Sequence, residues 1–136
     1  MERLGAPGFT ETMTASLKRQ PTVLVVEDEG LVRLDAVETL RDAGYAVVEA
    51  ANAEQALAVV AGGGTVDVLF TDINMPGRMD GLELARRVNR LEPHIHVLLT
   101  SGKVSPERGE IPNHGLFISK PYSPEAMTRA VGRMLA

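Results

Sequence analysis

The sequence has no cysteine and no tryptophan, and its longest unbroken apolar run covers only residues 56–61. The missing cysteine excludes disulfides, thiolate metal sites and cysteine nucleophiles. An aromatic content of 4% argues against a platform on which nucleic-acid bases stack. The apolar run is far too short to span a membrane, and the amino terminus lacks the apolar stretch of a secretory signal. We therefore expect a cytoplasmic protein that makes no membrane contact.

Neither sign of charge dominates, since 14 Lys and Arg stand against 18 Asp and Glu for a net charge of -4. Nucleic-acid-binding surfaces are usually basic, so direct DNA binding is not expected. A length of 136 residues suits one domain. Residues 1–20 lack a sustained apolar period and contain Gly5, Pro7 and Gly8. We expect a flexible leader over residues 1–20 and one domain over residues 21–136.

Five apolar runs rich in branched side chains follow this leader, at residues 23–26, 46–48, 66–70, 95–99 and 116–118. Continuous runs of this kind are typical of strands buried on both faces of a sheet. Their starts are separated by about 20 to 30 residues, which leaves room for a crossover helix each time. The pattern predicts an α/β fold with a parallel sheet and helices on both faces.

The segments between the runs carry helical signals of unequal strength. Asn52 with Gln55, and Asp80 with Glu83, have the spacing of capping boxes at helix starts. The helix after Asp80 is expected to bury a stripe of three residues, Leu84, Val88 and Leu91. Between residues 101 and 115 a long regular helix is not expected, because the chain carries Pro106, Gly109 and Pro112. We expect the fourth helix to be short or irregular.

Polar residues follow four of the predicted strands. They are Glu27-Asp28-Glu29, Thr71-Asp72, Thr100-Ser101 and Ser119-Lys120. The carboxyl ends of parallel strands meet at one edge of a sheet, where such folds bind ligands. Carboxylates gathered there repel one another, and Mg²⁺ with its preference for oxygen ligands offsets that repulsion. A hydroxyl and an ammonium beside them suit an anionic group such as a phosphoryl group.

These motifs resemble the receiver domain of two-component response regulators. The resemblance rests on Val-Val-Glu-Asp-Glu at 25–29, Thr-Asp-Ile-Asn-Met-Pro at 71–76 leading to Met-Asp-Gly at 79–81, Leu-Leu-Thr-Ser-Gly at 98–102 and Ser-Lys-Pro-Tyr at 119–122. All four come in the family's order and together cover the chain from Thr22 to Ala136. The resemblance implies a doubly wound, flavodoxin-like sheet of five strands in the order 2-1-3-4-5.

The resemblance also implies a role for each matching acidic residue. Asp72 is expected to be the phosphoacceptor, attacking a phosphohistidine on a sensor histidine kinase or a histidine phosphotransfer protein. Glu27, Asp28, Asp72 and the main-chain carbonyl of Asn74 are expected to hold Mg²⁺. Glu27 stands where the family more often has Asp and reaches one methylene further. The domain is then a signalling module that catalyses only its own phosphorylation and slow dephosphorylation.

Two further residues are expected to serve the phosphoryl group. Lys120 would offset the charge on the phosphoryl oxygens, and Thr100 would be the switch hydroxyl that bonds them. Phe117 stands where the family has an aromatic that turns inward, and the Lys120–Pro121 bond is expected to be cis.

Three departures from the family pattern set further expectations. Gly77, Arg78 and Met79 form a three-residue stretch where the family has two, which is expected to lengthen the loop over the site. The broken fourth helix lies where many relatives dimerise, so we expect a monomer or a weak dimer. The sequence ends directly after the fifth helix, so the signal is expected to pass to an unidentified downstream protein.

Two alternatives use the same residues. A metal-dependent phosphoesterase could present carboxylates at this edge, although such enzymes often have Asp-x-Asp where this sequence has Asp72-Ile73-Asn74. A phosphorylation-independent interaction module would keep the fold but has no need for the whole set of polar residues. Catalytic turnover of a phosphoester distinguishes the first alternative, and failure to bind Mg²⁺ distinguishes the second.

Overall fold

The computed structural model describes residues 20–136, so nearly all of the leader expected over residues 1–20 lies outside the described residues. The side-chain amide of Gln20, the first described residue, donates a hydrogen bond to the carbonyl oxygen of Gly44 at 2.9 Å. No helix within residues 20–136 is both long enough and apolar enough to cross a membrane.

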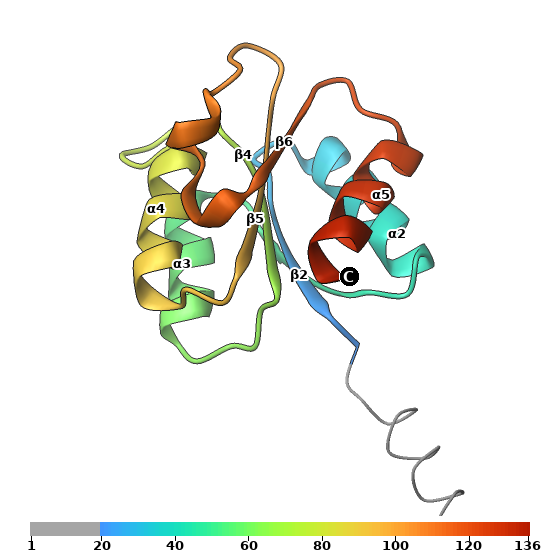
Figure 1. Ribbon diagram of the computed structural model, residues 1–136, viewed down its shortest axis with the longest axis horizontal. Helices are drawn as coiled ribbons and strands as arrows, with labels where there is room; N and C mark the ends of the chain where they lie inside the picture. The colour runs from blue at the N-terminus through green and yellow to red at the C-terminus, as the bar shows by residue number, and fades with distance from the viewer. Residues whose placement is uncertain (1–19) are drawn as a thin grey trace, which may run out of the picture.

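Five parallel strands form one sheet (Figure 1), and the predicted order is confirmed. The strands are β2 (Thr22–Val26), β3 (Ala46–Ala50), β4 (Val68–Asp72), β5 (His96–Ser101) and β6 (Leu116–Ser119). Their order across the sheet is β3-β2-β4-β5-β6, and every neighbouring pair is parallel. The order reverses between β2 and β4, the place where ligand crevices form in such sheets.

Helices cover both faces of the sheet. Figure 1 shows α3 (Ala53–Ala61) and α4 (Gly81–Leu91) on one face, and α2 (Gly30–Asp42) and α5 (Pro124–Leu135) on the other. Two short 3₁₀ turns, η1 (Arg108–Glu110) and η2 (Pro112–His114), stand where a fourth crossover helix was expected to be irregular. Asn113 and His114 have left-handed backbone angles, with φ of 58° and 51°, which a continuing α-helix does not allow.

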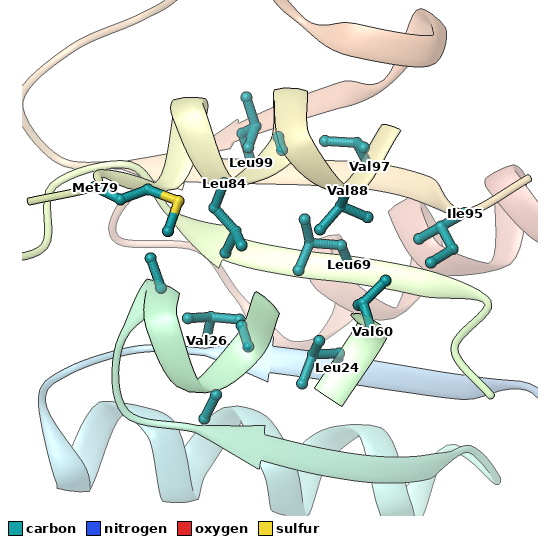
Figure 2. Packing of buried hydrophobic residues seen from close by; sticks show 14 of the residues in the cluster. Leu24, Val26, Val60, Leu69, Met79, Leu84, Val88, Ile95, Val97 and Leu99 are labelled. Atoms are coloured by element: carbon teal, nitrogen blue, oxygen red, sulfur yellow. The ribbon is translucent and has the colours of Figure 1, made fainter. Parts of the chain in front are cut away.

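The strand side chains divide between two buried clusters because successive residues point to opposite faces. Leu24, Leu69 and Leu99 pack under α3 and α4 with Val60, Leu84 and Val88 (Figure 2). Val23, Phe70 and Leu98 pack under α2 and α5 with Val37, Leu40, Met127 and Val131. Both faces of the sheet are therefore buried under helices, as the continuous apolar runs predicted.

The predicted helix starts are correct, but neither reciprocal capping bond forms. The side chains of Asn52 and Asp80 each accept the expected bond, from the backbone N–H of Gln55 and Glu83, both at 2.8 Å. Gln55 accepts from the N–H of Ala51, one residue before the cap, at 2.8 Å. The Glu83 carboxylate instead lies near three arginines of its own helix, Arg86, Arg87 and Arg90. A charged partner competes well with a neutral N–H for the carboxylate.

The prediction that Leu91 belongs to the buried stripe of α4 is also wrong. Leu84 and Val88 are fully buried, but Leu91 is 50% exposed. Leu91 is the last residue of α4, and the residues after it, 92–94, are exposed as well. The end of the helix therefore lacks a surface on which Leu91 can pack.

Candidate functional site

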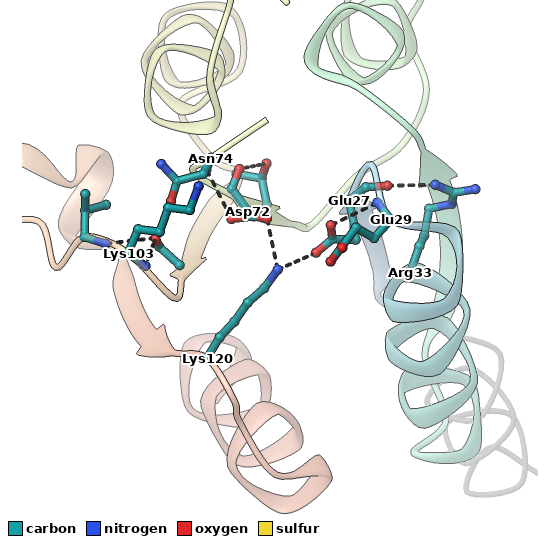
Figure 3. A network of polar contacts seen from close by, with 10 residues as sticks. Glu27, Glu29, Arg33, Asp72, Asn74, Lys103 and Lys120 are labelled. Atoms are coloured by element: carbon teal, nitrogen blue, oxygen red, sulfur yellow. Dashed lines mark hydrogen bonds and ion pairs between the residues drawn. The ribbon is translucent and has the colours of Figure 1, made fainter. Parts of the chain in front are cut away.

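The polar residues predicted at the strand ends gather at the carboxyl edge of the sheet. Glu27 follows β2 directly, Asp72 ends β4, Thr100 lies near the end of β5, and Lys120 follows β6. The parallel register pairs Asp72 with Thr100 on neighbouring strands. Lys120 follows the edge strand β6, and its side chain reaches Asp72 and Glu27 at the middle of the sheet (Figure 3).

The Lys120 ammonium joins the two most buried carboxylates of the site. Its Nζ lies 2.8 Å from Oε1 of Glu27 and 2.9 Å from Oδ2 of Asp72. The Glu27 and Asp72 side chains are only 5% and 8% exposed, and the Lys120 side chain is 22% exposed. Buried carboxylates are costly without a partner, so the ammonium serves as their counter-charge.

Burial and pairing shift the pKa of two members of this group. Burial raises the pKa of Glu27 above its ordinary value, although the hydrogen bond from Lys120 opposes the shift. For Lys120, burial by itself lowers the pKa, but the hydrogen bonds to Glu27 and Asp72 outweigh it and the pKa lies above its ordinary value. Lys120 is therefore a fixed positive charge across the physiological range.

Backbone groups hold the carboxylates in place. The N–H of Glu29 donates to Oε2 of Glu27 at 3.1 Å, and the N–H of Asn74 donates to Oδ1 of Asp72 at 3.1 Å. The Arg33 guanidinium on α2 donates to the carbonyl oxygen of Glu27 at 2.7 Å. Sequence reasoning missed Arg33, because no spacing rule connects a helix side chain to a strand-end carbonyl.

The donor set at this edge fits a hard divalent cation. Glu27, Asp28 and Asp72 each offer a carboxylate oxygen, and these oxygens lie within 4.8 Å of one another. Asp28 is exposed and Asn74, whose carbonyl was predicted as a ligand, is exposed beside it. Both line a cavity of about 440 Å³ together with Asp72 and Lys120. Three carboxylates and one ammonium leave two negative charges when all are ionised, which suits a divalent ion with oxygen ligands.

Thr100 carries a hydroxyl without a partner. The residue is 2% exposed, and its Oγ1 makes no hydrogen bond within residues 20–136. A buried hydroxyl left unpaired is costly, and such a group calls for an explanation. Its place beside Asp72 on the neighbouring strand leaves a donor available for a group that binds at the sheet edge.

The Lys120–Pro121 bond is cis, as expected. Phe117 on β6 is half-buried and packs against the cluster under α3 and α4. The loop at residues 77–79, where one residue more than the family pattern was expected to lengthen the loop, lies near α3. Met79 is buried, and Arg78 and Met79 line a cavity with Glu54 and Leu57 of α3. The burial of the Met79 side chain draws the loop toward α3.

A second cavity continues from Lys120 along the face of α2. It has a volume of about 540 Å³ and is lined by Leu31, Val32, Asp35, Lys120, Pro121 and Tyr122. Leu31 is 84% exposed, the highest exposure among the large apolar side chains of residues 20–136. Burial raises the pKa of Tyr122 to about 12, and its ring meets Phe70 edge-on at 5.6 Å. We call this apolar surface the α2 shelf.

The sequence matches the family described as response regulator receiver domain over residues 23–132. It is 36% identical over 123 residues to the sensor kinase CckA of Brucella abortus (strain 2308), covering 88% of this chain and 13% of that protein. It is 30% identical over 117 residues to the response regulator receiver protein CpdR of the same strain, covering 83% of this chain and 95% of CpdR. The chain thus spans a small part of the length of CckA and nearly the whole of CpdR.

Solved structures agree with this relationship. A response regulator receiver protein from Sinorhizobium medicae WSM419 superposes with a TM-score of 0.80 at 27% identity, covering 86% of this chain and 95% of that one. The chain belongs to the response regulator receiver domains of two-component signalling.

Proposed function

We propose that this domain accepts a phosphoryl group on Asp72 from a phosphohistidine, in a reaction that depends on Mg²⁺. The observation that carries the proposal is that two hydrogen-bond donors, the Lys120 ammonium and the Thr100 hydroxyl, lie beside the Asp72 carboxylate. Lys120 already bonds Asp72 at 2.9 Å, and the buried Thr100 hydroxyl on the next strand has no partner within residues 20–136. Both donors suit the oxygens of a phosphoryl group attached to Asp72.

Asp72 is the nucleophile of the proposed reaction. One of its carboxylate oxygens attacks the phosphorus atom, a phosphorus–oxygen bond forms, and the phosphorus–nitrogen bond to the donor imidazole breaks. The backbone N–H of Asn74 and the Lys120 ammonium orient the carboxylate for this attack. The domain then catalyses its own phosphorylation, and slow hydrolysis returns the free carboxylate.

The acidic group holds the cofactor in this proposal. Glu27, Asp28, Asp72 and the carbonyl of Asn74 would bind Mg²⁺, and the three carboxylates are close enough to share one ion. When bound, Mg²⁺ would neutralise charge that grows on the phosphoryl oxygens during transfer. Burial raises the pKa of Glu27 above its ordinary value in the metal-free site, and a bound cation would favour the ionised carboxylate.

Lys120 and Thr100 stabilise the product. After transfer, the Lys120 ammonium exchanges part of its contact with Asp72 for a phosphoryl oxygen, and the Thr100 hydroxyl donates to another. A hydrogen bond from a previously unpaired buried hydroxyl removes a cost present in the unmodified protein. Phosphorylation therefore biases the position of Thr100, and the β5–β6 side of the sheet transmits that bias to the surface.

The α2 shelf is the docking surface for the phosphodonor. It is apolar, it opens beside Lys120, and Leu31 at its rim is 84% exposed. A sensor histidine kinase or a histidine phosphotransfer protein would cover this surface and bring its phosphohistidine to Asp72. Burial of Leu31 by the partner supplies apolar stabilisation that a small phosphodonor cannot use.

The setting of the reaction follows from the same proposal. The working unit is one domain over residues 21–136, cytoplasmic, and present as a monomer or weak dimer. It signals through contact with a downstream protein and does not bind DNA directly. CpdR, which this chain spans almost completely, is itself described as a response regulator receiver protein, which supports this arrangement.

The test is phosphorylation by a small donor. We expect acetyl phosphate with Mg²⁺ to add one phosphoryl group, detected by intact mass spectrometry, and the adduct to be labile in base. Asp72→Asn should abolish the addition. Asp42→Asn is the matched control, because Asp42 is exposed at the far end of α2, about 18 Å along the helix axis from its start.

Three outcomes would overturn the proposal. No addition to the wild-type protein would do so, and so would an addition that survives Asp72→Asn. Repeated turnover of a phosphoester above ~1 s⁻¹ would favour a phosphoesterase instead.

A further inference from the structure

Ser101 makes more hydrogen bonds than any other hydroxyl of the site. It is the last residue of β5 and is 1% exposed. Its Oγ donates to Oδ1 of Asn74 and accepts from the backbone N–H groups of Lys103 at 3.0 Å and Val104 at 3.1 Å. One donor and two acceptor positions are all that a hydroxyl possesses. Ser101 thus joins the loop after β4 to the loop after β5.

This arrangement determines which end of the Asn74 amide is free. Both acceptor positions of Ser101 are taken by backbone N–H groups, so the hydroxyl can offer only its hydrogen to Asn74. The partner atom must therefore be the amide oxygen, and the amide nitrogen remains as the donor that can serve the cavity that Asn74 lines. The same cavity is lined by Lys103, whose backbone Ser101 holds.

We propose that Ser101 is a positioning residue that lengthens the life of the phosphoryl group on Asp72. Resting on the proposed function, this inference adds a regulator of the same site. With its oxygen held by Ser101, the Asn74 amide presents N–H groups to phosphoryl oxygens. The side-chain oxygen of Asn74 then cannot accept a hydrogen bond from water. If it were free, this oxygen could orient a water molecule for attack on phosphorus.

Hydrolysis is the step that Ser101 would slow. A water oxygen bonds to phosphorus, the bond between phosphorus and the Asp72 oxygen breaks, and the Asp72 carboxylate and inorganic phosphate are released with the water proton. An acceptor that orients water speeds such a step. Removing the Ser101 hydroxyl frees the Asn74 amide to rotate and present its oxygen.

The experiment compares Ser101→Ala with Ser119→Ala. Ser119 ends β6, is paired with Ser101 in register and is exposed, so it is a matched control. Formation and hydrolysis of the phosphorylated protein are followed separately, with acetyl phosphate and Mg²⁺ and then after donor removal. We expect Ser101→Ala to speed hydrolysis by about three- to tenfold while formation changes less than about twofold. Ser119→Ala should change neither.

A double variant tests whether Ser101 acts through Asn74. In an Asn74→Ala background the amide is absent, so adding Ser101→Ala should leave hydrolysis unchanged. Ser101→Thr, which keeps the hydroxyl, should retain the slow hydrolysis of the wild-type protein. Urea unfolding of each variant confirms that the populations compared are folded.

The outcomes separate this inference from the proposed function. If the wild-type protein takes no phosphoryl group, both fail. If the wild-type protein is phosphorylated on Asp72 but Ser101→Ala hydrolyses at the wild-type rate, only the role of Ser101 fails. The role of Ser101 also fails if its effect persists without Asn74. Amide exchange gives a readout independent of phosphorylation, since Ser101→Ala should speed exchange at Lys103 and Val104.

Discussion

At the scale of single residues, Lys120 connects the two buried carboxylates of the site. Its ammonium contacts Glu27 and Asp72, which approach it from two different strands. Without the ammonium, only a cation from solution could balance the negative charge of these two nearly buried carboxylates. Lys120 therefore supports the fold of the unmodified protein and, in the proposed reaction, the phosphoryl group on Asp72.

Lys120→Met should lower the free energy of unfolding in the presence of a chelator by about 1–3 kcal/mol. The reason is that Glu27 and Asp72 lose their counter-charge, while the methionine keeps much of the apolar stem. Mg²⁺ should stabilise this variant more than the wild-type protein, because the cation no longer competes with the ammonium. Urea unfolding with and without Mg²⁺ measures both effects.

The control is Lys103→Met, since Lys103 is exposed and lines the cavity that Asp72 and Lys120 also line. An equal loss of stability in the two lysine variants would show that the pairing with Glu27 and Asp72 has no special importance.

Glu27 sets a pH dependence of opposite sign to that of most carboxyl groups. Its pKa is raised on folding, mainly by burial. The stability that its protonated form contributes is therefore complete below the pKa of the unfolded chain and is lost as the pH rises through the folded pKa. In metal-free protein, Glu27→Gln should remove this component of the decline as the pH rises above the ordinary pKa of a glutamate carboxyl. Urea titrations across that range, compared with Asp42→Asn, would detect it, and an unchanged slope would contradict it.

At the scale of elements, the start of α4 lies directly against the backbone of Asp72 and Ile73. A Cβ atom placed on Gly81 would lie 1.9 Å from the carbonyl oxygen of Asp72 and 2.9 Å from Cα of Ile73. The N–H of Gly81 donates to the carbonyl oxygen of Ile73 at 2.9 Å. Only glycine allows the helix to approach this close, because any side chain would meet backbone that cannot yield cheaply.

Gly81→Ala should therefore lower the free energy of unfolding by about 1–3 kcal/mol and slow phosphorylation, since relief of the clash displaces Asp72. Gly109→Ala is the matched control, because a Cβ atom there has no neighbour within 4 Å. Chemical denaturation and the rate of phosphorylation by acetyl phosphate measure the two effects. A Gly81→Ala variant as stable and as active as Gly109→Ala would contradict this account of the α4 start.

The helix signals show how far local sequence determines an element. Ser123 caps α5 by accepting from the N–H of Ala126 at 3.0 Å, with Pro124 in the first turn. These bonds lie within a few residues, so their spacing suffices to predict them. Glu83 was expected to bond back to its cap but lies 3.0 Å from Arg87, because several local partners were available and spacing alone does not choose among them.

At the scale of the whole molecule, the sheet brings an apolar shelf next to a charged site. The shelf combines α2 with the segment between β6 and α5, which are far apart in the sequence. In the proposed function, a partner binds the shelf by apolar contact and delivers its phosphoryl group to the polar edge. Binding and chemistry are then separable by mutation.

Leu31→Ser should leave the free energy of unfolding within about 0.5 kcal/mol of wild type, because the leucine is 84% exposed. Phosphorylation by acetyl phosphate should also be unchanged. Transfer from a phosphorylated histidine phosphotransfer protein should slow, because the partner loses an apolar contact. The two rates, measured in parallel, test the shelf. Equal rates of transfer to Leu31→Ser and wild-type protein would contradict the docking assignment.

By itself, the sequence determined the five strands, the helix starts, the break before β6 and the residues at the strand ends. These features follow from apolar periodicity, capping and proline, which act over a few neighbouring residues. Only the tertiary structure decided that Lys120 reaches Glu27, 93 residues away, and that Ser101 bonds Asn74, 27 residues away. It also decided that the Thr100 hydroxyl has no partner within residues 20–136. Contacts of this kind depend on how strands are placed side by side, which no local pattern specifies.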